Sequence, residues 1–503
     1  MKRHKFTTIV FSDARKLFMV VLGSLLCCLA ADCAGAQQSQ NKQESSEPTN
    51  IEAWPFIFEL NIGQSCRVER HSEKSTITRT VELLGVKHRM QPDYWCKDND
   101  THEIFEVAEV SIAVDGVPST LLARPYQSPI EVNGLRLLVE TTQAWALNAS
   151  YNAMKDVKHA VRFSVVAAGE SWGPTNIHFP ILSYRWRSST YYNTWSQIVP
   201  YNTLYYHRGE DLGAIPDRLE VVAPWDGTVT KSPPPEGDGG SNGLFIRHAD
   251  GTVVHFAHMN TEHLTAAAAT GNQVTAGTVL GLTGSTWAGR KSQTRDPHLH
   301  VGFNRGDMQI DPFPFFTEAY FRDYPDTLIP IAGGYAFTVP GRPIRLDATR
   351  SVARPGKQLT NFSWQLQDGQ RIESSVAETV YDKPGLYSEM LTVTADDGSV
   401  DVDFLQVRVY DPTRGSNIAR GWVHMYPGRG LTRGMTALFW NRLTAVENVV
   451  IDFGDGSPAV AFGESAEHAY TRSGLHIVTV TGHGPKDEPV TVRLRVIVEA
   501  GDE

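Results

Sequence analysis

The chain has 503 residues, of which 41% are hydrophobic and 20% charged, and its formal net charge is −10. This composition supplies a sizeable core, excludes a wholly disordered chain and predicts roughly three or four domains. The negative charge argues against nucleic acid as the main partner, because phosphate binding needs a clustered basic surface. With 42 glycines, 28 prolines and few long helical patterns, the sequence predicts an all-β fold with many turns.

Residues 1–36 have the order of a secretory signal peptide. A basic segment precedes an apolar run at 18–31, and the small residues Ala34-Gly35-Ala36 follow. The run is shorter than the roughly 20 residues that span a bilayer, and the mature chain is expected to have no transmembrane segment. We therefore expect export to the periplasm or the cell exterior. Lipoprotein anchoring at Cys33 is the alternative, although Asp32 stands where a small residue would be needed.

The five cysteines divide into two groups. Cys27, Cys28 and Cys33 lie in the segment that is predicted to be removed. Cys66 and Cys96 remain as an even pair in an exported chain, which predicts a structural disulfide between them. A redox or metal-binding pair is the alternative.

The first part of the mature chain has no residues that point to catalysis. Residues 37–50 are polar and predict a disordered leader. Residues 51–180 alternate short β-like runs with turns at Asp115-Gly116 and Asn133-Gly134, which predicts a β-rich N-terminal domain. An aromatic-rich stretch at 181–206 follows, and it serves either as core or as a wall of a substrate groove.

Two short motifs within residues 181–330 contain the residue types that bind metals. His207-Arg-Gly209-Glu-Asp211 sets a histidine and an aspartate around a glycine, and His298-Leu-His300 sets two histidines at i and i+2. Zinc takes imidazole nitrogen and carboxylate oxygen, and a catalytic zinc site has three protein ligands and one open position. Residues i and i+2 of a strand face the same way, so both histidines of the second motif can reach one site.

Further blocks lie between these motifs. Asp226-Gly227 and Asp250-Gly251 each follow an apolar alternation and predict two hairpins. All of these blocks lie between the two motifs: Ala223-Pro-Trp-Asp-Gly-Thr-Val229, Gly243-Leu-Phe-Ile-Arg-His-Ala-Asp-Gly251, Phe256-Ala-His258-Met259 and Val274 to Gly284. The ordered series of motifs and blocks resembles the lysostaphin-type (LytM-like) zinc metallopeptidases, a family that cleaves peptidoglycan cross-links.

The resemblance implies an antiparallel β-sheet peptidase domain over residues 181–330 that holds one Zn²⁺ ion. His207, Asp211 and His300 would be the zinc ligands. His258 and His298 would be catalytic histidines that do not bind the metal. His298 would act as general base on the attacking water, and His258 would stabilise the developing oxyanion.

Three features depart from the family pattern. Phe256 stands where tyrosine is usual, Gly302 stands where an acidic residue often lies, and 231–243 is an irregular loop that is able to alter the groove. None of the three removes a ligand. Two nearby histidines, His248 and His255, are not expected to be ligands, and His248 is assigned to a hairpin.

The end of the chain contains two copies of one pattern, at 331–412 and 413–503. An Asp-Gly turn, a Tyr-x-x-x-Gly segment and a strand recur in each copy, which is typical of immunoglobulin-like β-sandwiches. Both copies resemble PKD (polycystic-kidney-disease) domains, and Asp452-Phe-Gly-Asp-Gly456 makes the second the nearer match. The pair is a candidate for binding wall polymer or protein.

These expectations combine into an exported zinc metalloendopeptidase that hydrolyses peptide bonds of peptidoglycan stem peptides or cross-bridges, or of a glycine-rich peptide. Two alternatives stay open. One is an inactive regulator with a peptidase fold, and the other is a cell-surface or polysaccharide-binding protein whose PKD-like pair carries the main function. The complete ligand motifs favour the enzyme, because inactive relatives usually lose ligands.

Overall fold

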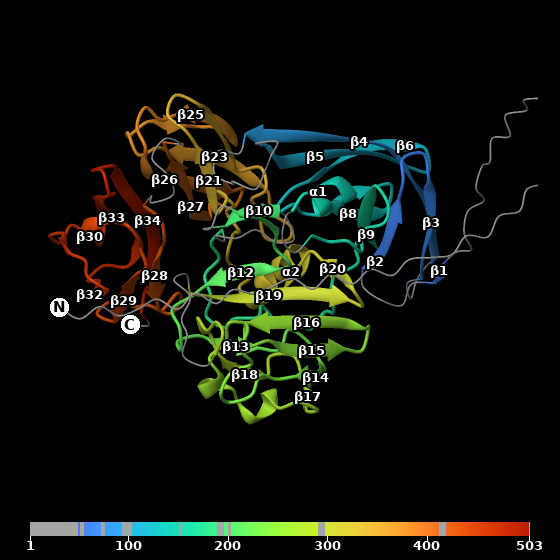
Figure 1. Ribbon diagram of the computed structural model, residues 1–503, viewed down its shortest axis with the longest axis horizontal. Helices are drawn as coiled ribbons and strands as arrows, with labels where there is room; N and C mark the ends of the chain where they lie inside the picture. Colours follow the sequence, from blue (N-terminus) through green and yellow to red (C-terminus); the bar gives the residue numbers. More distant parts are fainter. Residues whose placement is uncertain are drawn as a thin grey trace, which may run out of the picture. The chain divides into compact units, whose positions relative to one another are not determined.

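The structure is a computed structural model, which describes residues 49–50, 55–71, 76–92, 103–149, 153–188, 196–199, 203–289, 297–411 and 419–501. Within these residues the chain forms 34 strands, two α-helices and two 3-10 helices (Figure 1). The prediction of an all-β fold is therefore confirmed.

The N-terminal part contains two sheets, one with strand order β1-β3-β4-β5-β6 and one with order β2-β9-β8-β7. Alternation explains the first sheet, since Val81 and Leu83 of β4 are buried while Glu82 between them is exposed. The elements are β1 (Thr49–Asn50), β2 (Phe56–Leu60), β3 (Ser65–His71), β4 (Thr76–Pro92), β5 (Glu103–Val114), β6 (Val117–Ala123), β7 (Ile130–Val132), β8 (Leu135–Thr142), α1 (Gln143–Leu147) and β9 (Val161–Ala167).

The two predicted turns of this part are hairpin turns. Asp115 and Gly116 have φ angles of 49° and 79° and join β5 to β6, and Asn133 and Gly134 have φ angles of 46° and 81° and join β7 to β8. Positive φ at both central residues is what a two-residue type I′ hairpin requires. Both hairpin turns are thus as the sequence predicts.

The central part is built on a sheet with strand order β12-β19-β16-β15-β14-β17, and β20 pairs with β19 (Figure 1). β10 pairs with β11, and β13 with β18. The elements are β10 (Ser196–Val199), β11 (Thr203–Tyr206), β12 (Glu210–Gly213), β13 (Glu220–Val222), β14 (Gly227–Lys231), β15 (Leu244–His248), β16 (Thr252–Ala257), η1 (Thr261–His263), η2 (Ala266–Ala268), β17 (Gln273–Val274), β18 (Val279–Leu282), β19 (His298–Arg305), β20 (Met308–Ile310) and α2 (Phe313–Asp323).

One of the two hairpins predicted here is correct and one is wrong. Asp250-Gly251 joins β15 to β16, and Gly251 has a φ of 83°. Asp226-Gly227 does not make a hairpin, because β13 and β14 belong to different sheets. Gly227 is needed for close approach instead, since a Cβ there would lie 2.7 Å from the carbonyl oxygen of Arg247 on β15.

One hydrophobic core extends across the predicted boundary near residue 180. It contains Tyr126 and Trp172 from the N-terminal part together with Phe303 and Phe316 from the central part. Three aromatic residues of the stretch 181–206 are buried, namely Tyr184, Trp186 and Tyr206. For these three the interpretation as core is correct, and residues 189–195 and 200–202 lie outside the described residues.

The C-terminal part contains a nine-stranded sheet and two smaller sheets, β22-β25 and β28-β29-β32. The large sheet runs through both predicted repeats, because β26 of the first pairs with β34 of the second at Leu386 and Val490. The elements are β21 (Tyr335–Thr338), β22 (Pro343–Asp347), β23 (Leu359–Gln365), β24 (Arg371–Ile372), β25 (Val376–Val380), β26 (Gly385–Ala395), β27 (Val400–Val409), β28 (Val423–Tyr426), β29 (Thr436–Asn441), β30 (Glu447–Asp452), β31 (Val460–Ala461), β32 (Ser465–Ala469), β33 (Gly474–His483) and β34 (Pro489–Val498).

Several predictions fall on residues outside the described ranges. They include the signal peptide at 1–36 with Cys33, and most of the leader, of which only Thr49–Asn50 is described, as β1. Cys96 also lies outside, so the Cys66–Cys96 disulfide stays a prediction; Cys66 has no disulfide partner among the described residues. No helix in the described part of the chain is long and apolar enough to cross a membrane.

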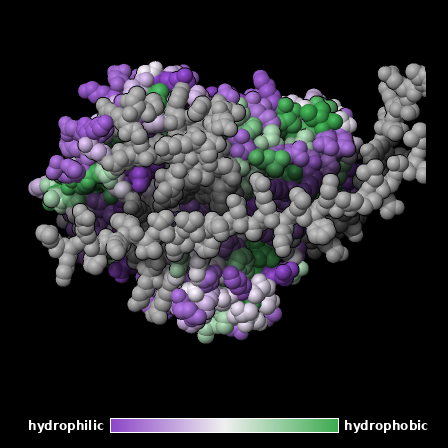
Figure 2. All heavy atoms as spheres, in the orientation of Figure 1, coloured by the Kyte–Doolittle hydropathy of each residue, from purple (hydrophilic) through white to green (hydrophobic). Residues whose placement is uncertain are grey.

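The surface is mixed in hydropathy, and Figure 2 shows hydrophobic residues gathered over the part that carries β4 to β6. Leu84 and Val117, exposed by 46% and 48%, belong to this sheet.

His248 is a buried histidine at the end of β15 that gives the fold an expected sensitivity to acid. Its ring lies 4.1 Å from that of Trp225, and its Nδ1 donates to the carbonyl of Asp226 at 2.8 Å. Burial lowers the pKa of His248 to about 4. Below pH 6.5 the unfolded chain therefore binds a proton at His248, whereas the folded chain binds it only near pH 4. The free energy of unfolding consequently falls as the pH drops from 6.5 toward 4.

We expect His248→Asn to be less stable than the wild type at pH 7, because it loses the contact with Trp225. Between pH 7 and pH 5, however, the wild type should lose about 2 kcal/mol more unfolding free energy than the variant. Urea denaturation at the two pH values measures this difference. Equal losses in both proteins would show that His248 is not the acid-sensitive group.

Candidate functional site

Two paired strands bring the motifs at 207–211 and 298–300 together. β12 runs antiparallel to β19, and the register sets Asp211 opposite His300 and Gly213 opposite His298. Directly opposed residues on one face of an antiparallel pair are close neighbours. The strand pairing thus joins a carboxylate to an imidazole across 89 residues of sequence.

Gly209 allows the chain to place His207 next to this pair. Its φ is 154°, and a Cβ there would lie 2.5 Å from the carbonyl oxygen of Val301 and 2.8 Å from Cε1 of His300. Any side chain at this position would push the first motif away from β19. The glycine between His207 and Asp211 is therefore a steric requirement of the site.

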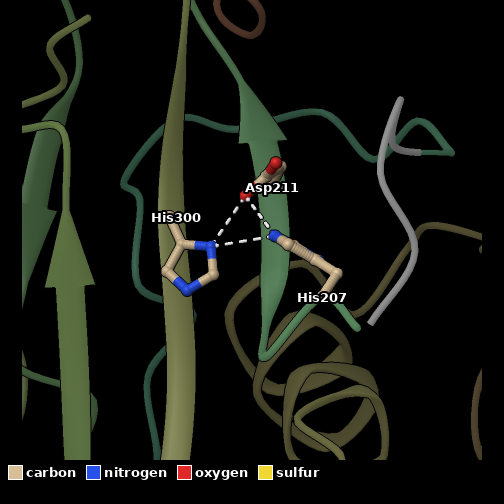
Figure 3. A group of neighbouring side chains, drawn as sticks. All are labelled: His207, Asp211 and His300. Atoms are coloured by element: carbon tan, nitrogen blue, oxygen red, sulfur yellow. Dashed lines mark hydrogen bonds and ion pairs between the residues drawn. The ribbon is translucent and has the colours of Figure 1, made fainter. Parts of the chain in front are cut away.

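The side chains of His207, Asp211 and His300 converge on one point (Figure 3). Nε2 of His207 lies 3.1 Å from Nδ1 of His300 and 3.1 Å from Oδ1 of Asp211, and the last two atoms are 2.8 Å apart. All three residues are largely buried, with side chains exposed by 6%, 5% and 13%. Two imidazoles and one carboxylate form the donor set that zinc accepts, and three protein donors leave a fourth position open.

His298 and His258 lie next to these three residues. Nε2 of His298 is 3.5 Å from Oδ2 of Asp211, in keeping with the expectation that both histidines of the second motif face one site. The ring of His258 lies 4.7 Å from the ring of His298 and 6.4 Å from that of His300. The structure thus gathers all five candidate residues, three as a converging set and two beside it.

The backbone holds His258 in a fixed orientation. Its φ is 68°, its amide donates to the carbonyl of Ser241 at 2.6 Å, and its Nδ1 donates to the carbonyl of Thr286 at 2.9 Å. A non-glycine residue in the left-handed region persists only where its surroundings hold it there. Nε2 of His258 is therefore the nitrogen left for chemistry.

Burial and neighbouring charges set the protonation of the site. Burial opposes ionisation of Asp211, but His207 and His298 outweigh it and hold the pKa of that carboxyl well below its usual range. Burial, followed by the charge of His298, lowers the pKa of His258 to about 3, and burial also lowers the pKa of His300. A carboxyl that stays ionised is ready to bind a cation, because the ligands of a metal must be deprotonated.

The features that depart from the family pattern have local explanations. Phe256 is fully buried in the hydrophobic core. A Cβ at Gly302 would lie 2.6 Å from the carbonyl oxygen of Arg208, so an acidic side chain does not fit there. The ring of His255 stacks on Phe245 at 4.3 Å and lies 5.5 Å from the ring of His300, outside the converging set.

The irregular loop at 231–243 is ordered by Asp238. Its carboxylate accepts hydrogen bonds from the amides of Gly240, Asn242 and Gly243 at 2.9 to 3.1 Å. The loop in turn offers the Ser241 carbonyl that holds the backbone of His258. Sequence reasoning missed this role and that of Thr286, because backbone carbonyl contacts leave no side-chain pattern.

A hydrogen bond from the N-terminal part supports β12. The hydroxyl of Tyr126 donates to Oε1 of Glu210 at 2.7 Å, and both residues are almost completely buried. Burial raises the pKa of Glu210 well above its ordinary value, although the bond from Tyr126 works against the increase. Because Glu210 precedes Asp211, this contact connects the N-terminal part to the strand that carries a predicted ligand.

We expect Tyr126→Phe to lower the unfolding free energy by about 1–3 kcal/mol, because a buried carboxyl loses a hydrogen-bond donor. Thermal or urea denaturation measures the change. A double-mutant cycle with Glu210→Gln isolates the pair, since the coupling energy reports only the interaction between the two side chains. A coupling energy near zero would mean that the bond contributes nothing to stability.

Comparison with known families agrees with this geometry. The model of peptidase family M23 matches residues 205–312, which contain all five candidate residues. Residues 205–312 are a peptidase family M23 domain. The model of the PKD domain matches residues 328–409, the first of the two predicted repeats. The PKD assignment of the second repeat, whose turn is nearer to the motif, stays a prediction.

Two solved structures illustrate what the chain is similar to. A structure described as a glycyl-glycine endopeptidase LytM from Ruminococcus gnavus is 26% identical over 22% of this chain and 47% of its own, with a TM-score of 0.20. Csd3 from Helicobacter pylori is 14% identical over 51% of this chain and 74% of its own, with a TM-score of 0.22. The M23 domain thus spans about half the length of the first. With TM-scores this low, neither likeness extends the assignment beyond the matched domains.

Proposed function

We propose that the protein is an exported zinc metalloendopeptidase that hydrolyses peptide bonds in peptidoglycan stem peptides or cross-bridges. The observation that carries the proposal is the convergence of His207, Asp211 and His300 within an M23 domain. The signal-like order of residues 1–36 supports export.

The converging residues fit zinc by their chemistry. Two imidazole nitrogens and one carboxylate oxygen lie within 4.8 Å of one another, and the pKa of Asp211 is held low, so the carboxyl is ready to bind a cation. A zinc ion bound there would supply Lewis-acid polarisation of the scissile carbonyl and would make an attacking water more acidic. Positioning that water and moving its proton is left to the neighbouring histidines.

The contact between His258 and Thr286 bears on how the two histidines divide this work. A carbonyl only accepts, so Nδ1 of His258 carries the proton, and in a neutral imidazole Nε2 is then an acceptor. A general base needs such a free lone pair, whereas a group that stabilises an oxyanion must donate. The general-base role is therefore open to His258 as well as to His298, to which the family resemblance assigns it.

Digestion of purified peptidoglycan sacculi tests the proposed function. The expected result is the release of muropeptides whose masses, measured by mass spectrometry, identify a cleaved peptide bond. The zinc content of the same preparation separates the enzyme from an inactive regulator with the same fold. A folded, zinc-loaded protein that releases no muropeptide would contradict the proposal.

A further inference from the structure

Trp287 is a large apolar side chain that remains exposed at the edge of the site. Its exposed fraction is 54%, and its ring centroid lies 5.5 Å from that of His258, with an angle of 30° between the ring planes. It directly follows Thr286, whose carbonyl orients His258.

Hydrogen bonds hold the chain on both sides of Trp287. The buried side-chain amide of Asn242 donates to Oγ1 of Thr286 at 2.8 Å and to the carbonyl of Gly289 at 3.2 Å. The hydroxyl of Thr286 in turn donates to the carbonyl of Met259 at 2.7 Å. The indole is therefore presented to solvent by a segment that hydrogen bonds hold in place. Such preorganisation lowers the entropy that is lost when a ligand binds to the indole.

The distances place Trp287 within reach of a bound peptide. An extended peptide advances about 3.3–3.6 Å per residue. The ring of His258 lies 4.7 Å from that of His298 and 5.5 Å from that of Trp287. These separations correspond to one to two residues of extended peptide, so the indole is within reach of the residues that flank a peptide bond attacked beside the two histidines.

We propose that Trp287 is a substrate-binding residue that selects peptides with small side chains next to the scissile bond. This inference rests on the proposed function. A flat indole face packs closely on peptide planes that carry only glycine or alanine, and buries apolar area on both. A β-branched side chain facing the indole holds the backbone away from it, and the contact is lost.

Kinetics on a soluble peptide with glycine beside the scissile bond test this inference. Trp287→Ala is expected to raise KM about tenfold, which corresponds to about 1.4 kcal/mol, with kcat changed less than about threefold. Trp287→Phe should restore most of the lost affinity, since it keeps an aromatic face. Trp287→Ala should also reduce the preference for glycine over valine at the flanking position. Zinc content should stay unchanged in both variants.

A matched control is Val460→Ala, at an exposed apolar side chain on β31, with no expected effect on KM. An unchanged KM and an unchanged glycine preference in Trp287→Ala would overturn the inference, as would a loss of kcat together with zinc. If the wild type cleaves no peptide, the proposed function fails separately. Calorimetric titration of the same peptide into wild type and Trp287→Ala then tests the contact without turnover, and equal affinities would overturn it.

Discussion

Replacing His258 with alanine is expected to leave zinc bound and to lower kcat at least about 100-fold. His258 is not among the three converging donors, and its Nδ1 is already committed to the carbonyl of Thr286. Its ring lies 4.7 Å from that of His298, beside the place proposed for a reacting water or carbonyl. Removing the ring therefore takes away a proton acceptor or donor without removing a ligand. Steady-state kinetics and metal analysis of the same preparation measure both parts.

Added imidazole distinguishes the two roles of His258. If His258 is the general base, a free imidazole that enters the vacated space should restore part of the lost kcat, with a dependence on the concentration of its neutral form. The matched control is His263→Ala, which removes a half-exposed histidine on η1 whose Nε2 is 3.5 Å from Asp217. Activity that survives in His258→Ala would show that this histidine has no part in the reaction.

Local patterns were enough to predict two features of the geometry of the site, whereas the ligand and catalytic roles came from the family resemblance and stay predictions. The two-residue period of a strand predicts that His298 and His300 share a face, and the pairing of β12 with β19 adds Asp211 to them. The glycine between His207 and Asp211 indicated a turn, and in the structure it is the residue that lets the backbone approach His300. The shared face and the turn could be predicted because each depends on residues close in sequence, whereas the pairing that adds Asp211 joins residues 89 apart.

Contacts that join distant segments could not be predicted in this way. Asp226-Gly227 has the composition of a turn, yet Gly227 is a packing glycine against β15, and only the neighbouring strand shows the difference. The carbonyl of Thr286 orients a histidine 28 residues earlier in the sequence, and any residue type offers a carbonyl. Trp287 belongs to no motif, so only its place beside His258 draws attention to it.

Replacing Asp211 with asparagine is expected to lower zinc affinity at least about 100-fold. Loss of a residue that only hydrogen-bonds to a metal ligand lowers affinity by up to about 100-fold, and loss of a ligand is expected to cost at least as much. Asp211 is the carboxylate of the converging set, and its Oδ1 lies 2.8 Å from Nδ1 of His300 and 3.1 Å from Nε2 of His207. Asparagine keeps the shape but removes the negative charge that balances a dication. Peptidase activity should fall with the metal.

Thermal denaturation with and without zinc provides a readout that does not depend on activity. A ligand that binds only the folded state stabilises it by about 2.7 kcal/mol at 100 times its Kd, so zinc should raise the Tm of the metal-free wild type. Asp211→Asn should show little or no increase at the same zinc concentration. Asp217→Asn is the matched control, since Asp217 is half-exposed, accepts from Asn260, and lies outside the converging set. An equal increase in Asp211→Asn and the wild type would place the zinc elsewhere, whereas no increase in the wild type would favour an inactive regulator built on the M23 domain.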